Sequence, residues 1–579
     1  MPGFKITSFK GAVPKLAPRL LAPEFAQTAL NARLENGDLK GYGAITIDSS
    51  LEPIGRESSS NLREDGSPTT IYKYGTHWLH WMFDVDVVQS PIVNDSTDRL
   101  YFTGDGIMKM TNNELVTDTN ATPATVDYKT DLTTPIYRKP YTSQAVGMPK
   151  PTEAPTTAWI TGSTASLDLE QRFYVYTYVN ATGEESAPSA PSPRVAALLT
   201  EEPVIGVTIP STNGVYESIA KVRLYVTATG SNATDFQFCA ETTTVTGGVT
   251  IIDTGNRAEV LPTKTWVPPD TNLKGLTAMA NGVLAGFYEN TLMFSEPYIP
   301  YAWPIEYQLG VPYEIVGLGR AGDQLVICTK GTPYLASGAT SASMDLIGLS
   351  VEQACVSKRS IVSILDGVIY ASPDGLVYVS SGGAELLTKD LITRAQWSTY
   401  NPSSIHAYQH DNLYYAFNGT GGFIFNPVDK HFVTIDLDTD AAFNDIITDT
   451  LYVYQNLSKL TDVSEYNANY PFWNIAPWTS DTTDDTFTWT SKVFITERPT
   501  ILSTGQVVFT AGGGTTSLTL TIDGTALSPI AVTADATGVA TFRLPSGSRG
   551  THWEITLSGT SAIEAVYFAD SVSGLSGIQ

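Results

Sequence analysis

The feature of this sequence that most constrains its fold is a turn, strand, turn, strand element that recurs through the second half of the chain. It stands in "NGVLAGFYENTLMFSEP", "GDQLVICTKGTPYLASG", "LDGVIYASPDGLVYVSSGG", "HDNLYYAFNGTGGFIFNP" and "TDTLYVYQNLSKL". Its aliphatic anchors are spaced by 41, 43, 45 and 38 residues: Leu284, Leu325, Val368, Leu413 and Leu451. Four-stranded propeller blades repeat at about this interval, roughly 40 to 50 residues. The spacing predicts a β-propeller; an irregular antiparallel sandwich whose hairpins recur by chance is the alternative.

A further blade is predicted in residues 69–147. This span contains "TTIYKYG", "HWLHWMF", "DRLYFTG" and "GIMKM", which read as four consecutive antiparallel strands. With residues 271–486 it gives a propeller of about six blades. The composition agrees, because 29 Tyr, 47 Gly, 34 Pro and only 16% charged residues suit many short strands joined by tight turns. The predicted fold class is all-β.

Three other segments complete the predicted domain organisation, since 579 residues exceed what one core can serve. Residues 1–68 form an N-terminal arm with one short helix at 24–33, where Ala26, Ala29 and Leu30 share a helical face. Residues 148–270 alternate in "RFYVYTYV" and "KVRLYVT" and predict an inserted fibronectin-like or immunoglobulin-like β-sandwich. Residues 487–579, rich in Thr, Ser and Gly, predict a C-terminal β-sandwich.

The charge balance excludes one class of function. Against 59 Asp and Glu there are 34 Lys and Arg, so the net charge is −25 and the surface repels phosphate. Sequence-specific nucleic-acid binding is therefore not expected.

Three cysteines, Cys239, Cys328 and Cys355, imply no disulfide framework. No apolar run approaches the roughly 20 residues of a membrane span, and no export signal is apparent. The chain is expected in the cytoplasm, or to be assembled there and released by lysis.

Two clusters of polar residues are candidate metal sites. Asp436, Asp438 and Asp440 stand at alternate positions of a calcium-loop pattern, but Ala441 and Ile447 occupy the places of its Gly and Glu. A solvated acidic turn is the better interpretation. His406 and His410, with Asp411, lie in "NPSSIHAYQHDNLYYAF", which reads as strand and turn. These are predicted to be structural histidines, because no other ligand motif accompanies them.

Catalytic and nucleotide motifs are not apparent either. "ASPDGLVY" around Asp374 has the Asp-Gly of a turn, with Ser372 and Gly375 too close together for a sialidase-type Asp turn. "TAGGGTTS" lacks the lysine of a phosphate-binding loop, and no nucleophile elbow occurs. We therefore predict no catalytic, cofactor-binding or metal-binding residues and no enzyme. Neither metal nor nucleotide should be needed for folding; an unfamiliar glycosidase stays an open alternative.

Several stretches resemble tail proteins of short-tailed bacteriophages, the nozzle or tail tubular protein B-like virion proteins. In the middle of the chain they are "FSEPYIPYAWP", "IVGLGRAGDQLVICTKGTPYLASG", "QACVSKRSIV", "YASPDGLVYV" and "WSTYNPSSIHA". The N-terminal "FKGAVPKLAPRLLAPEFAQTALNARLENGDLKGY" and the C-terminal "FRLPSGSRGTHWEITLSGT" also resemble such proteins. The likeness covers both ends and the middle, and is weakest at residues 148–270.

The resemblance implies a structural virion protein: a homohexameric ring below the portal and adaptor, assembled in the host cytoplasm and located in the virion tail. Genomic DNA would pass through its lumen without specific binding, tail fibres would be a further contact, and no membrane insertion is implied. An acidic lining would suit that passage. Trp303, Trp397 and Arg359 are expected to be packing and turn residues. The alternatives are a carbohydrate-binding tail adhesin or receptor-binding propeller, and a depolymerising tail enzyme.

Overall fold

The computed structural model shows an almost entirely β-stranded chain, which confirms the all-β class. It describes residues 3–43, 68–75, 77–81, 83–113, 115, 143–158, 170–197, 203–208, 219–227, 235–245, 247–456, 473–478, 485–510 and 513–575. The α-helices whose bounds the structure describes are α2 (Arg394–Ser398) and α3 (Val572–Leu575). Neither is long and apolar enough to cross a membrane.

The chain divides into two units. Unit 1 comprises residues 1–84, 326–334 and 348–579, and unit 2 comprises residues 85–325 and 335–347. Single 3-10 turns interrupt the strands of both: Pro18–Leu20, Glu35–Gly37, Pro262–Thr265, Ile305–Tyr307, Ser341–Ser343, Lys358–Ser360 and Pro402–Ser404.

Unit 2 contains two four-stranded sheets whose strands pair in chain order. Their strands are β8 (Asp86–Gln89), β9 (Leu100–Gly104), β10 (Gly106–Thr111) and β11 (Gln144–Ala145), then β20 (Lys274–Ala278), β21 (Leu284–Tyr288), β22 (Thr291–Phe294) and β23 (Gln308–Gly310). The first strands, β8 and β20, pack beside each other. Tyr101, Met108, Leu284 and Trp303 lie in one core that both sheets share. A further four-stranded sheet has the order β24 (Ile315–Ala321), β25 (Gln324–Thr329), β26 (Tyr334–Ser337) and β27 (Asp345–Gly348).

Unit 1 repeats the same pattern of sheets. One sheet consists of β28 (Val362–Ile364), β29 (Gly367–Ser372), β30 (Gly375–Ser380) and β31 (Gly383–Leu386); the next begins with β32 (His406–His410), β33 (Leu413–Phe417), β34 (Gly422–Asn426) and β35 (His431–Ile435). Two smaller sheets are β36 (Ala442–Asp445), β37 (Thr450–Asn456) and β38 (Trp473–Pro477), and β6 (Thr70–Tyr74) with β7 (His77–Trp81). The first strands follow one another, since β28 packs on β32, β32 on β36, and β36 on β6.

The periodic anchors occupy equivalent places in these sheets. Leu284, Leu325, Val368, Leu413 and Leu451 each fall in the second strand of a sheet, namely β21, β25, β29, β33 and β37. All are fully buried except Leu413, which is partly buried. The repeat register predicted from the sequence is thus confirmed. In three of the sheets the first hairpin has a two-residue turn, at 322–323, 365–366 and Asp411–Asn412, and the φ values of 49° and 58° in the last are typical of a tight turn that fixes the strand register.

The helix predicted at residues 24–33 is wrong. This segment forms β3 (Phe25–Leu30) and β4 (Ala32–Arg33). β3 pairs with β39 (Phe487–Ser491) from the far end of the chain, in a register that joins Ala29 to Trp489. Small apolar residues such as Ala26 gain little from a helix face, whereas here they are buried completely between sheets. Tertiary pairing has overridden helix propensity.

The four strands predicted as one blade in residues 69–147 are divided between two sheets. β6 and β7 pair with each other, whereas "LYFTG" and "GIMKM" form β9 and β10 and pair with β8 and β11. The missing partner is β8, "DVVQ", whose polar sequence gives no strong strand signal. The sheet order therefore corrects that grouping.

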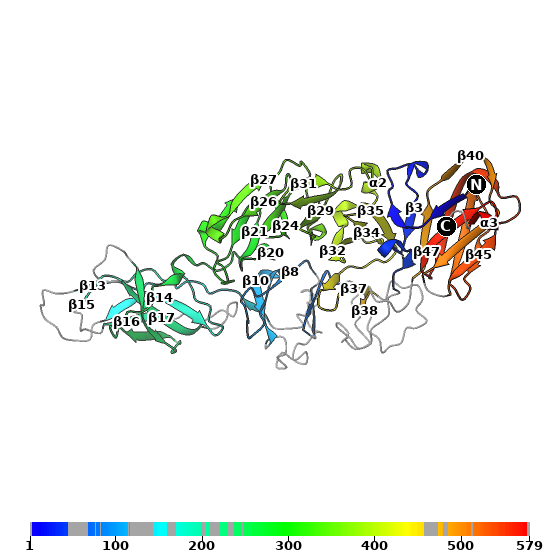
Figure 1. The fold of residues 1–579 in the computed structure, drawn as a ribbon. Coiled ribbons are helices and arrows are strands. Elements are labelled where there is room, and N and C mark those ends of the chain that lie inside the picture. Colours follow the sequence, from blue (N-terminus) through cyan, green and yellow to red (C-terminus); the bar gives the residue numbers. More distant parts are fainter. Residues whose placement is uncertain are drawn as a thin grey trace, which may run out of the picture. The chain divides into compact units, whose positions relative to one another are not determined.

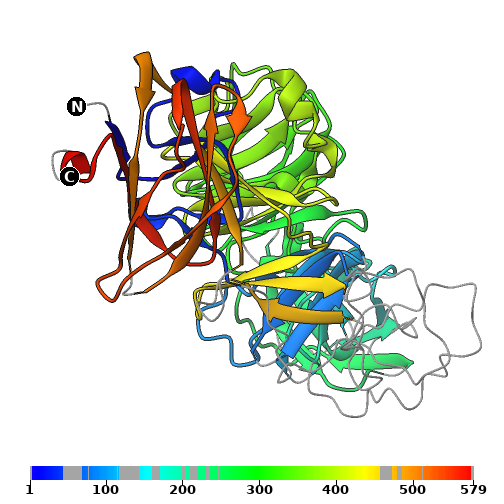
Figure 2. The same cartoon turned by 90° about the vertical axis from the view of Figure 1, so that its right-hand side faces the viewer.

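Both ends of the chain build the C-terminal sandwich. One sheet has the order β1 (Gly3–Ile6), β47 (Ile563–Ala569), β41 (Thr504–Phe509) and β45 (Val539–Arg543). The other continues from β35 through β2 (Lys10–Ala12), β3, β39, β46 (Arg549–Gly559), β42 (Thr515–Ile522) and β43 (Thr525–Ala526), with β40 (Phe494–Ile501) and β44 (Ile530–Thr533) beside it; β4 pairs with β5 (Lys40–Gly41). Figures 1 and 2 show the blue β1 beside the red β47. The N-terminal segment is thus an integral part of this unit.

Gly11 in β2 lies in close contact with β35. A Cβ at Gly11 would lie 2.3 Å from the Phe432 carbonyl oxygen and 2.5 Å from the His431 ring. We expect Gly11→Ala to destabilise unit 1 by about 1–3 kcal/mol through overpacking. Thermal unfolding measures the effect, with Gly310→Ala as control because its Cβ would meet no atom within 4 Å. Equal melting temperatures for both variants would contradict this placement of β2.

Residues 148–270 contain three small antiparallel sheets. Their strands are β12 (Thr156–Ala158), β16 (Val204–Thr208) and β19 (Gly248–Ile252); β13 (Glu170–Arg172) and β15 (Val195–Ala197); and β14 (Tyr174–Asn180), β17 (Ile219–Thr227) and β18 (Phe236–Thr242). Tyr176, Ile205, Leu224 and Ile251 from the two three-stranded sheets lie in one core. The segment is therefore a layered β structure, and its fibronectin-like character stays a prediction.

Candidate functional site

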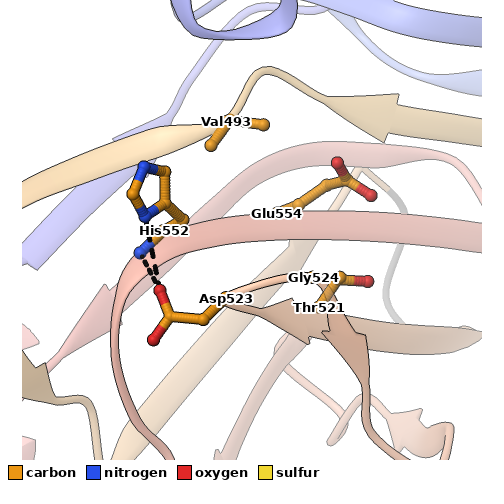
Figure 3. Close-up of a pocket in the computed structure, with 6 residues that line it drawn as sticks. All are labelled: Val493, Thr521, Asp523, Gly524, His552 and Glu554. Carbon is orange, nitrogen blue, oxygen red and sulfur yellow. Dashed lines mark hydrogen bonds and ion pairs between the residues drawn. The ribbon is translucent and has the colours of Figure 1, made fainter.

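A shallow polar depression lies on the C-terminal sandwich (Figure 3). It encloses about 390 Å³ and is lined by Val493, Thr521, Asp523, Gly524, His552 and Glu554. Asp523 and Gly524 form the turn between β42 and β43, and His552 and Glu554 project from β46. Strand pairing explains the convergence, because Thr521 on β42 stands opposite Glu554 on β46. Residues two apart on a strand share one face, so His552 and Glu554 point the same way.

Asp523 is held by the neighbouring strand. Its Oδ1 accepts hydrogen bonds from the His552 backbone N–H at 2.9 Å and from the Thr551 N–H and hydroxyl at 3.1 and 3.0 Å. The Nδ1 of the half-exposed His552 ring lies 3.3 Å from the same oxygen. Hydrogen bonds from the His552 and Thr551 backbone lower the pKa of Asp523, so it is a stable anion. A general acid needs a raised pKa, and Asp523 does not have one.

Glu554 is also engaged. Gln27 donates its Nε2 hydrogens to Glu554 Oε2 at 2.6 Å and to the Ser491 carbonyl at 2.7 Å. The neighbouring Trp553 is fully buried on the opposite face of β46, so it offers the depression no stacking surface. The site can accept hydrogen bonds from hydroxyl groups or hold a cation, but it lacks the aromatic platform that sugar-binding sites commonly use. Sequence reasoning missed it, because its residues are brought together by strand pairing.

The acidic run in residues 436–440 does not form the calcium loop. Asp436 Oδ1 accepts a hydrogen bond from Asn31 Nδ2 at 2.8 Å, and the Asp440 carbonyl accepts one from Arg359 at 2.7 Å. Among the described residues, these carboxylates do not form a group that could hold a metal ion. The loop connects β35 to β36 and ties neighbouring strands together.

The two candidate histidines have different surroundings on β32. His406 Nε2 lies 2.7 Å from the Thr439 carbonyl, and the ring stacks on Phe417. Burial and the nearby Arg359 lower the pKa of His406 to about 4, so it is neutral at pH 7 and structural, as predicted. His410 instead lies beside Asp411 and Asp449, and the ligand atoms of these three residues are within 4.8 Å of one another.

The remaining sequence candidates are structural. Asp374 belongs to the turn between β29 and β30, where Ser372 Oγ donates to the Gly375 carbonyl at 2.9 Å, and Gln353 donates to Asp374 at 2.9 Å. In "TAGGGTTS", Ala511 and Gly512 lie outside the described residues, and Gly513 and Gly514 lead into β42. The three cysteines are free thiols, all buried.

Trp303, Trp397 and Arg359 are packing and linking residues, as expected. The buried Trp303 and Trp397 indoles donate to the carbonyls of Pro300 and Ser372, each at 2.8 Å. Arg359 donates to the Thr69 carbonyl at 2.6 Å as well as to Asp440. It thereby connects three segments that are distant in the sequence.

A buried ionic network in unit 2 had no signal in the sequence. Asp253 is fully buried and accepts hydrogen bonds from Arg172 at 3.1 Å, the Tyr174 hydroxyl at 2.7 Å and Arg257 at 2.9 Å. Cys239 Sγ lies 3.1 Å from it. Burial by itself raises the pKa of Asp253, but the bonds from Arg257 and Tyr174 outweigh this and lower the pKa to about 2. The charged pairs are satisfied internally, which is typical of a structural network.

Comparisons with known proteins identify no family. No family model matches the chain, and no curated protein matches it. A solved structure of an exo-beta-1,3-galactanase from Phanerochaete chrysosporium shares 8% identity over 68% of this chain and 98% of that one, with a TM-score of 0.20. The AfRom2 CNH domain shares 8% identity over 60% and 93%, with a TM-score of 0.22. PorZ, a surface component of the type-IX secretion system of Porphyromonas gingivalis, shares 10% over 92% and 84%, with a TM-score of 0.25. Similarities at this level define no common fold or function.

Proposed function

We propose that this chain is a structural subunit of the tail nozzle of a short-tailed bacteriophage, and that it is not an enzyme. The proposal rests on the sequence resemblance and on one observation that supports it. The residues within the resembling stretches link strands and sheets together. Of the six residues that line the depression on the C-terminal sandwich, His552 and Glu554 belong to such a stretch.

The central stretches supply many of these links. Arg359, in "QACVSKRSIV", bonds to the carbonyls of Thr69 and Asp440, and Ser357 Oγ donates to the Ile405 carbonyl at 2.6 Å. Trp397, in "WSTYNPSSIHA", donates to Ser372 of the preceding resembling stretch. Such side chains hold neighbouring sheets in fixed positions. A subunit of a conduit needs this rigidity to keep its shape.

The terminal stretches support the same role. Phe9 packs edge-on against Trp489 with ring centroids 5.0 Å apart, and the Trp489 indole donates to the Lys10 carbonyl at 3.0 Å. Thus the N-terminal stretch is bonded into the sandwich that carries the C-terminal stretch. Pairing N-terminal strands with strands from the other end of the sequence disfavours local opening of those strands.

The finer architecture is part of the proposal. The four-stranded meanders of each unit, with their first strands packed in succession, are the blades of a propeller. Six chains would form a ring whose channel passes the genome. A net charge of −25 per chain suits a lumen that does not grip DNA, because phosphate contacts of a basic lining would retain it.

Imaging of the purified full-length chain tests this function. We expect negative-stain images to show rings or short tubes, either of the chain alone or after it is mixed with disrupted short-tailed phage particles. Light scattering after size exclusion should give a mass near six times 62.4 kDa for the rings. Monodisperse monomers that never bind phage tails would overturn the proposal.

A carbohydrate-binding tail adhesin is the second candidate, and the polar depression on the C-terminal sandwich favours it. Carboxylates that are fixed by hydrogen bonds, as Asp523 and Glu554 are, can accept hydrogen bonds from sugar hydroxyls. A glycan array separates the two functions. Saturable binding by the monomer that is lost in Glu554→Ala would favour the adhesin, and no binding to any glycan would leave the nozzle as the supported function.

A further inference from the structure

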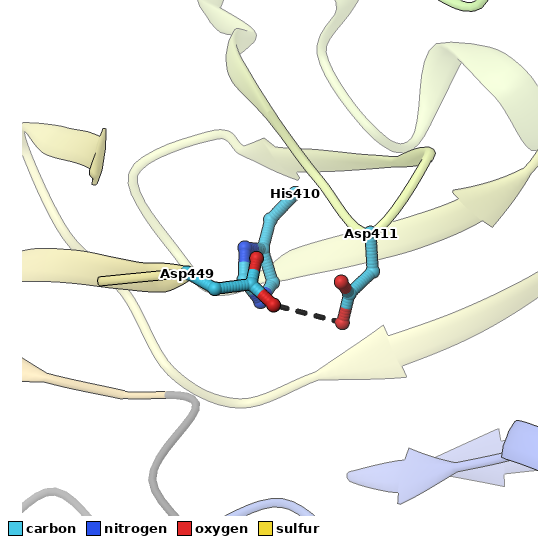
Figure 4. Close-up of side chains that lie close together, drawn as sticks. All are labelled: His410, Asp411 and Asp449. Atoms are coloured by element: carbon cyan, nitrogen blue, oxygen red, sulfur yellow. Dashed lines mark ion pairs between the residues drawn. The ribbon is translucent and has the colours of Figure 1, made fainter. Parts of the chain in front are cut away.

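His410, Asp411 and Asp449 bring a nitrogen and two carboxylates together at the ends of two hairpins in unit 1 (Figure 4). His410 and Asp411 lie at the turn between β32 and β33, and Asp449 lies at the turn between β36 and β37. Asp411 and Asp449 are 38 residues apart, which is the spacing of the anchors Leu413 and Leu451. The repeat therefore places these two carboxylates on equivalent turns of adjacent sheets.

The orientation of the buried His410 ring is set from outside this cluster. His410 is only 2% exposed, and its Nδ1 lies 3.1 Å from Asn444 Oδ1. The Asn444 amide is itself oriented, because its Nδ2 donates to Gln409 Oε1 at 3.2 Å. An oxygen facing Nδ1 requires a hydrogen on that nitrogen, so in the neutral ring the lone pair is on Nε2.

That lone pair points at negative charge. His410 Nε2 lies 3.4 Å from Asp411 Oδ2, and one ligand atom from each of His410, Asp411 and Asp449 lies within 4.8 Å of the other two. A lone pair facing two carboxylates is repulsive unless a cation lies among them. A metal ion at the centre of the cluster would accept that lone pair and offset the charge of both carboxylates. An Nδ1–H held by an amide oxygen is the arrangement that orients metal-binding histidines.

We propose that His410 Nε2 and the carboxylates of Asp411 and Asp449 bind one divalent transition-metal ion of the Zn²⁺ class, with water in the remaining positions. Mixed imidazole and carboxylate ligands suit Zn²⁺ and its first-row neighbours. Ca²⁺ and Mg²⁺ prefer sets made only of oxygen, so the imidazole disfavours them. Two carboxylates also balance the 2+ charge of the ion.

Such an ion would join two adjacent sheets. β32 and β36 already pack side by side, and the metal would add a bond between the turns at their ends. Because only the folded chain brings together ligands 38 residues apart, binding should stabilise the native state. The site has no local sequence motif for the same reason, since its ligands are one repeat apart.

Titration calorimetry of the metal-free full-length chain with Zn²⁺ tests the proposal. We expect one Zn²⁺ per chain and a melting temperature several degrees higher with Zn²⁺ than with EDTA, while Ca²⁺ and Mg²⁺ have little effect. Asp411→Asn and Asp449→Asn should each weaken binding at least about tenfold, the usual cost of losing one ligand or its orienting partner. Asn suits both positions, because each residue has a φ of 49°, which Asn readily adopts.

The matched control is Asp366→Asn in the equivalent turn between β28 and β29, which should bind Zn²⁺ like the wild type. Three results would overturn the proposal. The wild type could bind no Zn²⁺, it could prefer Ca²⁺, or the double Asn variant could retain full affinity, which would place the ion elsewhere.

Nitrogen NMR of His410 gives an independent readout. A doubly protonated ring at neutral pH, unchanged by Zn²⁺, would mean that a proton and not a metal balances the two carboxylates.

Discussion

Leu325→Asp is expected to lower the free energy of unfolding by at least about 4 kcal/mol. Leu325 is 0% exposed in β25, the second strand of its sheet. The substitution removes a buried aliphatic side chain, which alone costs about 2–5 kcal/mol, and leaves a carboxylate with no cation to pair with in its place. Differential scanning calorimetry of both proteins measures the loss as a large fall in the melting temperature, or as failure to fold.

Leu365→Asp is the matched control for this prediction. Leu365 is 50% exposed, and its φ of 53° lies in the left-handed region that Asp adopts more readily than Leu. The same change of side chain should therefore cost little at this position. If both variants unfold like the wild type, the repeat register that places Leu325 in a core is wrong.

Asp253→Ala is the second substitution with a large expected effect, about 3–5 kcal/mol. It removes the common acceptor of Arg172, Arg257 and the Tyr174 hydroxyl. Arg172 is only 1% exposed, so its charge would stay buried without this partner, and that is the costly outcome for a buried ion pair. Chemical unfolding followed by far-UV circular dichroism measures the loss. Asp235→Ala is the control, because Asp235 is exposed and lies in the same unit.

The same carboxyl group predicts a loss of stability in acid. Its pKa is about 2 in the folded chain against an ordinary value of 3.8. Because the folded pKa is the lower one, its contribution of about 2 kcal/mol is present above about pH 4 and disappears as the pH falls toward 2. Asp253→Ala should lack this part of the acid dependence. Parallel stability profiles of the variant and the wild type between pH 4 and 2 would contradict the assignment.

Local sequence patterns predicted the strands correctly where the structure depends on residues that are close together in the sequence. Alternation and turn residues identify the central hairpins of these sheets, and Leu284, Leu325, Val368, Leu413 and Leu451 mark the second strand of five sheets. The reason is that a hairpin is made by residues close in the sequence, so the local sequence determines both its turn and its apolar face.

Only the tertiary structure could decide what depends on distant partners. Residues 24–33 are strands because β39, more than 450 residues further on, supplies hydrogen bonds and burial that a lone helix lacks. Asp253 finds Arg172, and Glu554 finds Gln27, only after the sheets have formed. Thus the sequence by itself determined an all-β chain with a repeating hairpin. The polar depression, the buried ionic network and the joining of the two chain ends were decided by long-range strand pairing, because its register depends on packing that local patterns do not encode.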